Sequence, residues 1–322
     1  MYIVPEKDIA ALVGAEDSFE AVRQVFGAMA AGSAYNFPVI REAIGHADAL
    51  YGFKSGFDRQ GLNLGLKSGG YWPGNTAKGL TNHQSTVFLF DAETGKCRAI
   101  VGGNLLTALR TAAAAAVSVA CLARENARVL GIVGAGHQAA FQLRAVAAQR
   151  RFERVVAWNR SPEKLARLGA VARKLGLDFE AVSLQELGAQ ADVIVTITSS
   201  YAAILADAHV KPGTHIACMG TDTKGKQEVE AALVARASLF TDEVAQSVSI
   251  GEWPGLSPFS CHFPVSPRVQ ARHRQKGYPR QLPVGLRLAI WMRLPRAGAS
   301  YPHRGCQPLV APWPHRPCRH RI

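Results

Sequence analysis

The chain lacks the features that would tie it together covalently or direct it to a membrane. Its 322 residues include six cysteines, with no CxxC pair and no short spacing to histidine, so neither a disulfide framework nor a zinc site is indicated. No apolar run of about 18 residues is free of charged or polar residues. The first eight residues also lack the basic and apolar regions of a signal peptide. We therefore expect a soluble cytoplasmic protein with free thiols and no bound metal.

Acidic residues are absent from the last part of the chain. Residues 253–322 contain eleven Arg, one Lys and 12 of the 17 prolines, but no Asp or Glu, so their +12 leaves only +1 of the net +13 for residues 1–252. The segment shows neither helical nor strand periodicity and no nucleic-acid-binding module. Dense proline with unpaired like charge is typical of disorder. We predict an aberrant basic tail that is largely disordered, and we expect no nucleic-acid or membrane partner.

The first part of the chain has the patterns of an α+β domain. Residues 5–32 have the spacing of two helices, with Ser18 as the expected N-cap of the second. From 35 to 103, short β-rich runs alternate with Gly, Asn and Asp, which predicts an antiparallel sheet of hairpins. The Ala- and Leu-rich stretch 105–122 predicts a helix that bridges two domains. We expect residues 1–125 to form a substrate-binding and dimerisation domain.

The pattern then changes to strands that alternate with helices. Such alternation predicts a parallel, doubly wound sheet. We therefore expect an α/β protein, in which a Rossmann-type NAD(P)-binding domain over 126–252 follows the first domain. The expected parallel strands are 128–133, 154–158, 192–197 and 215–219.

A glycine-rich string, GAGHQA at 134–139, follows the first of these strands and opens a helix. Gly134 permits a tight turn, Gly136 lets a pyrophosphate approach the backbone, and the helix N-terminus offers free N–H groups. This context predicts a dinucleotide site. The second strand ends at Asn159 and Arg160 instead of an acid that would bind the ribose hydroxyls, so both NAD(H) and NADP(H) stay open.

Single basic residues stand in three apolar segments, at Arg41, Lys67 and Arg110. Each one alone would fit a structural ion pair equally well. Asp222 follows a predicted parallel strand at its carboxyl end, where ligands bind in open α/β sheets. Together these residues predict a pocket for a substrate carboxylate, with an acid beside it that handles a proton.

Three runs resemble the ornithine cyclodeaminase/mu-crystallin family: LLTALRTAAA at 105–114, GAGHQA, and GTDTKGK at 220–226. The resemblance covers nearly all of residues 1–252, and YNFPVIREAIGH at 35–46 resembles the members that reduce iminosuccinate to L-aspartate. It implies an NAD(P)H-dependent imine reductase that forms homodimers through the sheet of the first domain. Family members continue past residue 252 with helices and a strand, so the segment after it here looks like a change of reading frame.

The resemblance also implies roles for single residues. Arg41 and Lys67 match substrate-carboxylate contacts, and His83 is a candidate for a further one. Asp222, with Lys67 beside it, matches the group that handles the proton in catalysis. The residues expected to contact the cofactor are Asn82, Arg110, Gly134, Gly136, His137, Gln138, Asn159, Arg160, Thr198, Met219, Gly220, Thr221 and Lys226.

Three other functions stay open. Ornithine cyclodeamination would use the same site to convert L-ornithine to L-proline and ammonia, with no net consumption of cofactor. The site would also suit another ketimine reductase or an amino acid dehydrogenase. A non-catalytic, cofactor-binding protein of the mu-crystallin type is the third possibility, and the presence of Lys67, Arg110 and Asp222 argues against it.

Overall fold

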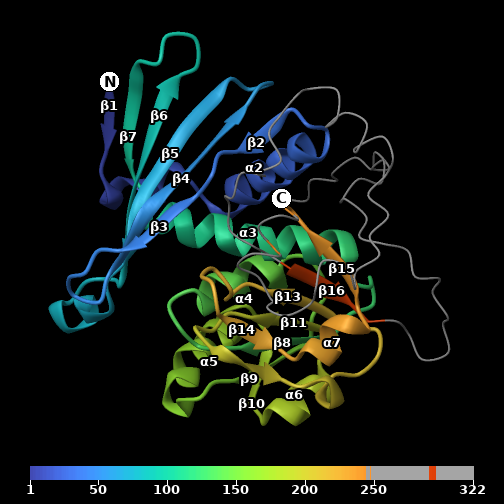
Figure 1. The fold of residues 1–322 in the computed structure, drawn as a ribbon. Coiled ribbons are helices and arrows are strands. Elements are labelled where there is room, and N and C mark those ends of the chain that lie inside the picture. Colours follow the sequence, from blue (N-terminus) through green and yellow to red (C-terminus); the bar gives the residue numbers. More distant parts are fainter. Residues whose placement is uncertain (244–246, 248–289, 295–322) are drawn as a thin grey trace.

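Two large sheets with a long helix between them make up the fold (Figure 1). The structure is a computed structural model that describes residues 1–243, 247 and 290–294. The helix is α3 (Asn104–Leu122), which packs against α2 (Ala15–Ala30) on one side and α4 (Ala139–Ala147) on the other. One sheet is mostly antiparallel and the other mostly parallel, which confirms the predicted α/β class.

The first sheet has seven strands, in the order β1-β7-β6-β5-β4-β2 with β3 also paired to β4. The hairpins are antiparallel as predicted, but β1 pairs parallel to β7 at the outer edge and was not expected. Only two apolar side chains in its described strands, Ala34 and Ala99, are buried. The strands are β1 (Tyr2–Val4), β2 (Ala34–Asn36), β3 (Ile40–Ala43), β4 (Leu50–Asp58), β5 (Asn63–Tyr71), β6 (His83–Asp91) and β7 (Cys97–Gly102).

Helix α2 begins earlier than the sequence pattern suggested, so the prediction of Ser18 as its N-cap is wrong. Gly14 is the N-cap, and its N–H donates to the Asp17 carboxylate at 2.8 Å. Ser18 lies inside the first turn, where its hydroxyl donates to the Gly14 carbonyl at 3.0 Å. The short helical elements of this part of the chain are η1 (Glu6–Asp8), α1 (Ile9–Leu12) and η2 (Pro73–Lys78).

The second sheet has the strand order β10-β9-β8-β11-β13-β16-β15. Its first five strands are parallel, in the doubly wound order expected for a dinucleotide-binding fold. Helices α3, α4 and α5 cover one face, and α6 and α7 the other. The bounds are β8 (Val129–Val133), β9 (Arg154–Trp158), η3 (Pro162–Lys164), α5 (Leu165–Lys174), β10 (Asp178–Ala181), α6 (Leu184–Gln190), β11 (Val193–Thr196), β12 (Tyr201–Leu205), η4 (Asp207–His209), β13 (His215–Cys218), β14 (Gln227–Val229), α7 (Ala231–Ala235), β15 (Ser238–Thr241) and β16 (Ile290–Arg293).

Strand β16 corrects the prediction for the tail. It lies between β13 and β15 and is antiparallel to both, and the side chains of Met292 and Leu294 are buried. The disorder prediction is therefore wrong for residues 290–294. The run IWMRL, in which four apolar residues flank one Arg, is too short a pattern to detect inside a Pro- and Arg-rich segment. The rest of the predicted tail lies outside the described residues.

Helix α3 is the element that joins the two sheets. It is long and apolar enough to cross a membrane by length and composition, but 56% of that stretch is buried inside the protein, as in a core helix. The five alanines 112–116 are all buried, and their small side chains let α2 and α4 approach closely. Ser118 Oγ lies 3.1 Å from His215 Nε2 of β13, which ties the helix to the second sheet.

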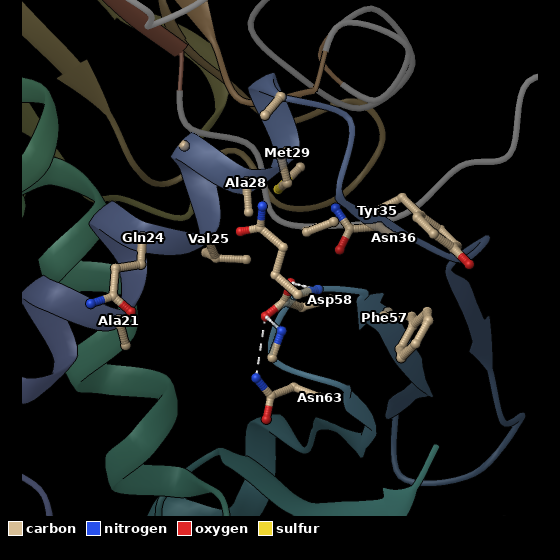
Figure 2. Close-up of a pocket in the computed structure, with 16 residues that line it drawn as sticks. Ala21, Gln24, Val25, Ala28, Met29, Tyr35, Asn36, Phe57, Asp58 and Asn63 are labelled. Carbon is tan, nitrogen blue, oxygen red and sulfur yellow. Dashed lines mark hydrogen bonds between the residues drawn. The ribbon is translucent and has the colours of Figure 1, made fainter. Parts of the chain in front are cut away.

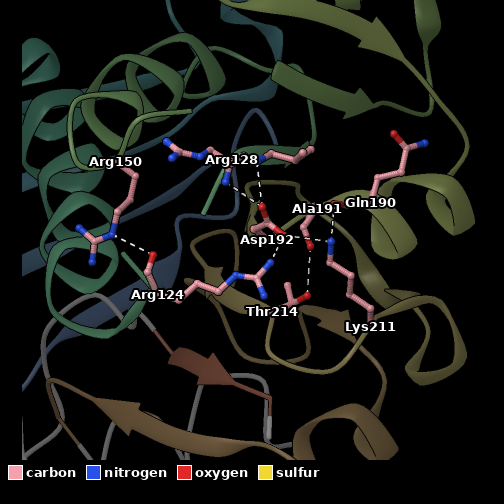
Figure 3. Close-up of polar contacts among 9 residues, drawn as sticks. Arg124, Arg128, Arg150, Gln190, Ala191, Asp192, Lys211 and Thr214 are labelled. Carbon is pink, nitrogen blue, oxygen red and sulfur yellow. Dashed lines mark hydrogen bonds and ion pairs between the residues drawn. The ribbon is translucent and has the colours of Figure 1, made fainter. Parts of the chain in front are cut away.

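Asp192 organises the amino end of strand β11 (Figure 3). Its carboxylate accepts hydrogen bonds from the backbone N–H groups of Arg128 (2.7 Å) and Val129 (3.1 Å). It also forms ion pairs with Lys211 (2.9 Å) and Arg124. Burial alone would raise the pKa of Asp192, but these hydrogen bonds and the Lys211 charge together hold it below its ordinary value. The network lies at the end of the sheet opposite the expected ligand site, so we interpret it as structural.

We expect Asp192→Ala to lower the free energy of unfolding by about 3 kcal/mol, because it strands two cations and two N–H groups around a buried position. Because the pKa of Asp192 is lower in the folded state, its ionised carboxylate stabilises the protein fully at a pH above its unfolded-state pKa, near 4. This stabilisation is lost as the pH falls through the folded-state pKa. Urea unfolding should therefore show the difference from wild type shrinking in acid. Asp178→Ala, at an exposed position on neighbouring β10, is the control. Equal stability of the two variants would contradict this assignment.

Candidate active site

The expected cofactor crevice lies where the order of the parallel strands reverses. Strand β8 pairs with β9 on one side and β11 on the other, and ligands bind at such a switch point in open sheets. The turn after β8 contains Gly134 with φ +109°, where a Cβ atom would lie only 2.7 Å from the Ile197 carbonyl oxygen. Gly134 is therefore required for the chain to turn here.

A dinucleotide fits this crevice. A Cβ atom at Gly136 would meet no atom within 4 Å, so the backbone beside it is open to a pyrophosphate. Two buried polar atoms, Gln138 Oε1 and Thr221 Oγ1, have no hydrogen-bond partner among the described residues, as expected at a site built for a ligand. His137 lies beside the ring of Phe141, and its pKa is lowered by partial desolvation of the imidazole and by the charge of Arg167.

The other expected cofactor residues fall into two groups. Thr198, Met219, Gly220 and Thr221 follow the carboxyl ends of β11 and β13, so they lie beside the glycine turn. Asn159 also reaches this turn, because its Oδ1 accepts from the Ala135 N–H at 2.9 Å, while Arg160 next to it is exposed. Arg110 and Asn82 belong to the first part of the chain: Arg110 is half-buried on α3, and Asn82 hydrogen-bonds to Thr76 and Tyr71.

The open space at Gly136 allows a direct test. We expect Gly136→Val to fold with the wild-type melting temperature and to bind NAD+ at least about tenfold more weakly, because its side chain would fill the approach to the phosphates. Isothermal titration calorimetry measures this affinity. Gly27→Val, at another glycine with open space around its Cβ position, is the matched control. Unchanged affinity in the Gly136 variant would place the dinucleotide elsewhere.

Glu228 is a buried carboxylate that the sequence analysis missed. Its side chain is fully buried and accepts hydrogen bonds from Thr196 Oγ1 (2.7 Å), the Thr198 N–H (2.6 Å) and the Gly220 N–H (2.9 Å), among others. Burial raises the pKa of Glu228. These contacts join the carboxyl ends of β11 and β13, so Glu228 holds together the two loops that border the crevice.

The expected substrate residues gather in a small pocket on the first sheet. Arg41, Lys67 and His83, from β3, β5 and β6, all line it, and Lys67 Nζ lies 3.4 Å from His83 Nε2. Lys67 also donates to Thr107 of α3 at 3.4 Å. Arg41 Nε is buried with no hydrogen-bond partner among the described residues. A pocket that presents several cations and an unsatisfied guanidinium N–H suits a carboxylate ligand.

Asp222 comes from the second sheet and meets this pocket. It follows β13, and its Oδ2 lies 3.5 Å from Arg41 Nη1. Its Oδ1 accepts from Lys226 Nζ at 2.6 Å, across a turn in which Gly225 has φ +87°. Asp222 thus lies between two cations at the border of the crevice and the pocket. The structure brings the expected acid and the expected carboxylate-binding residues together, although they are far apart in the chain.

A larger groove lies between α2 and the strands β2 and β4 (Figure 2). Its volume of about 730 Å³ is within the range of ligand sites, whereas the cationic pocket admits about 20 Å³, room for roughly one water molecule. Its one charged lining residue among those described, Asp58, already accepts from Gly61 and Asn63 in a turn. Because the described lining of the groove presents no cation, and its one acid is held in a turn, we place the chemistry in the smaller pocket, which must open to admit a substrate.

Known proteins share this architecture. The model of the ornithine cyclodeaminase/mu-crystallin family matches residues 8–262. Iminosuccinate reductase of Paracoccus denitrificans is 66% identical over 252 residues, which cover 78% of this chain and 79% of that protein. Its crystal structure in complex with NAD+ has a TM-score of 0.76 at 65% identity, covering 78% of each chain. An archaeal alanine dehydrogenase dimer with bound NAD has a TM-score of 0.72 at 27% identity, covering 78% of this chain and 77% of that one. The chain therefore belongs to the ornithine cyclodeaminase/mu-crystallin family.

Proposed function

We propose that this protein is an NADH-dependent imine reductase that converts iminosuccinate to L-aspartate. The observation that carries the proposal is the meeting of Arg41 and Asp222 beside Lys67, because two cations suited to a carboxylate and an acid suited to a protonated imine then lie close together. The 66% identity to an iminosuccinate reductase supports the choice of substrate. NADH is favoured over NADPH because the solved structure of that relative contains NAD+.

The chemistry requires one hydride on the imine carbon and one proton on the nitrogen, which together convert C=N to CH–NH. NADH supplies the hydride when bound. A protonated imine accepts hydride more readily, and the Asp222 carboxylate is placed to hold that cation by an ion pair. Arg41 and Lys67 would bind the carboxylate next to the reacting carbon and so fix its orientation. Thr198 and the residues after β13 would position the nicotinamide, with Glu228 holding their loops in place.

The proposal is tested by mixing the full-length protein with NADH, oxaloacetate and ammonia, which form iminosuccinate in solution, and following absorbance at the wavelength of the reduced cofactor. We expect loss of NADH with formation of L-aspartate in equal amounts. L-ornithine with NAD+ serves as the comparison. Proline formation from ornithine without net change in the cofactor, and no oxidation of NADH with iminosuccinate, would favour the cyclodeaminase alternative.

We further propose that the protein forms homodimers through the first sheet. Large apolar side chains on one face of its strands are exposed, including Ile3 (70%), Ile40 (54%) and Phe53 (39%), and an apolar face of this kind suits a protein interface. The related archaeal alanine dehydrogenase structure is a dimer. Sedimentation equilibrium should give about twice the 34.5 kDa mass of one chain, and a mass of one chain at micromolar concentration would contradict the proposal.

A further inference from the structure

Lys54 is a cation of the small pocket to which sequence analysis gave no role. It lies on β4 directly opposite Lys67 on β5, and both residues line the pocket with Arg41 and His83. Directly paired residues in an antiparallel sheet point to the same face, with Cβ atoms about 5 Å apart. Lys54 and Lys67 are therefore neighbours on the face that Arg41 also shares, since Arg41 pairs with Gly52 two residues from Lys54.

This arrangement has a cost for the folded protein. Like charges directly opposite each other destabilise a sheet, and Lys54, Lys67, Arg41 and His83 are all half-buried, where water screens their charges less than at the surface. Among the described residues that line the pocket, none is acidic. Asp222 contacts Arg41 at the border, and its charge is shared with Lys226. The described lining of the pocket thus presents several cations and no acid, which suits a ligand with more than one carboxylate.

We propose that Lys54 binds the second carboxylate of a dicarboxylic substrate and so selects it over monocarboxylic imines. This inference rests on the proposed imine reductase function and concerns the same site. Arg41 and Lys67 hold the carboxylate next to the imine, and Lys54 holds the one at the far end of the short carbon chain. Gly52 and Gly69 also line the pocket, and a Cβ atom at Gly52 would lie only 1.9 Å from the Ile40 carbonyl oxygen, so glycine lets β3 approach closely and keeps Arg41 next to the two lysines.

The test compares two substrates in Lys54→Met, which keeps the side-chain length and removes the charge. With NADH and iminosuccinate we expect kcat/KM to fall about 10- to 100-fold, mainly through KM, as for the loss of one charge-assisted hydrogen bond. With the imine of pyruvate and ammonia, which has one carboxylate, the change should stay within about threefold. Lys54→Arg, which keeps the positive charge, should retain the wild-type preference for iminosuccinate. Lys78→Met, an exposed lysine of the same part of the chain, is the matched control.

A second measurement does not depend on turnover. Calorimetric titration of the protein–NAD+ complex with succinate and with butyrate should show a preference for succinate in the wild type that disappears in Lys54→Met. If the wild type prefers succinate and Lys54→Met loses that preference, but the wild type does not reduce iminosuccinate, the proposed function fails while the role of Lys54 stands. Equal losses for both substrates, or an unchanged succinate preference in the variant, would overturn the role of Lys54.

Discussion

Asp222→Asn is expected to lower kcat/KM for iminosuccinate by about 100- to 10,000-fold, the range found when a positioned acid or base is removed. The amide keeps the size of the side chain and loses the negative charge that would stabilise a protonated imine. Steady-state oxidation of NADH measures the effect. The loss should appear in kcat, since an ion pair that strengthens as the nitrogen gains its proton acts mainly in the transition state.

Two controls separate this chemical role from a structural one. The affinity of Asp222→Asn for NAD+ should stay within about threefold of the wild type, because the glycine turn at Gly134 and Gly136 is untouched. Asp178→Asn, at an exposed site on β10, should leave activity unchanged. The assignment fails if the Asp222 variant reduces iminosuccinate at a rate close to that of the wild type.

Glu228→Gln should produce the second large effect. Glu228 is expected to act by holding the loops that border the crevice in place, and not by contact with the substrate. A glutamine can accept from one of the two backbone donors, Thr198 N–H or Gly220 N–H, but its own NH2 group must face the other. The buried N–H that loses its acceptor costs about 1–3 kcal/mol, and the loops after β11 and β13 should move apart. Because a displacement of about 1 Å can cost about 100-fold in rate, we expect kcat/KM to fall about 10- to 100-fold and NAD+ affinity to weaken.

Glu186→Gln is the matched comparison. Its carboxylate accepts from the Ser183 N–H at 2.9 Å and from the Ser183 hydroxyl at 2.8 Å, in a capping box at the start of α6 and away from the strand ends that border the crevice. We expect it to lower stability by no more than about 1 kcal/mol with no change in NAD+ affinity. If both variants lose stability equally and neither loses NAD+ affinity, Glu228 is a structural residue only.

The strands and helices that were predicted correctly are those with a strong local pattern. Residues 129–133 and 193–196 form buried strands because unbroken apolar runs suit a sheet covered on both faces. The alanines of α3 favoured a helix on propensity alone, and that prediction is confirmed. The N-cap of α2 was predicted wrongly because serine is a common N-cap residue and Ser18 precedes an apolar helical pattern. Gly14, the actual N-cap, has no side chain that would mark it in the sequence.

The parts of the site that were missed depend on tertiary structure. Glu228 stands in the string QEVEA, which is typical of an exposed strand edge, and only the return of β14 beneath the ends of β11 and β13 buries it. Lys54 looks like an outward-facing strand residue until the register with Lys67 is known. Both roles arise from pairs far apart in the sequence, and no local pattern encodes such a pair.

The two sheets differ in where their stability comes from. Strands β11 and β13 are buried along their whole length, so the second sheet carries its own hydrophobic core. The first sheet buries few apolar side chains among its described residues. In a dimer, part of its stability would therefore come from association of the two subunits and would depend on protein concentration. Dilution would then loosen the strands that hold Arg41 and Lys67. Specific activity should therefore decline at low enzyme concentration, and added dicarboxylate should oppose that decline by favouring the associated form.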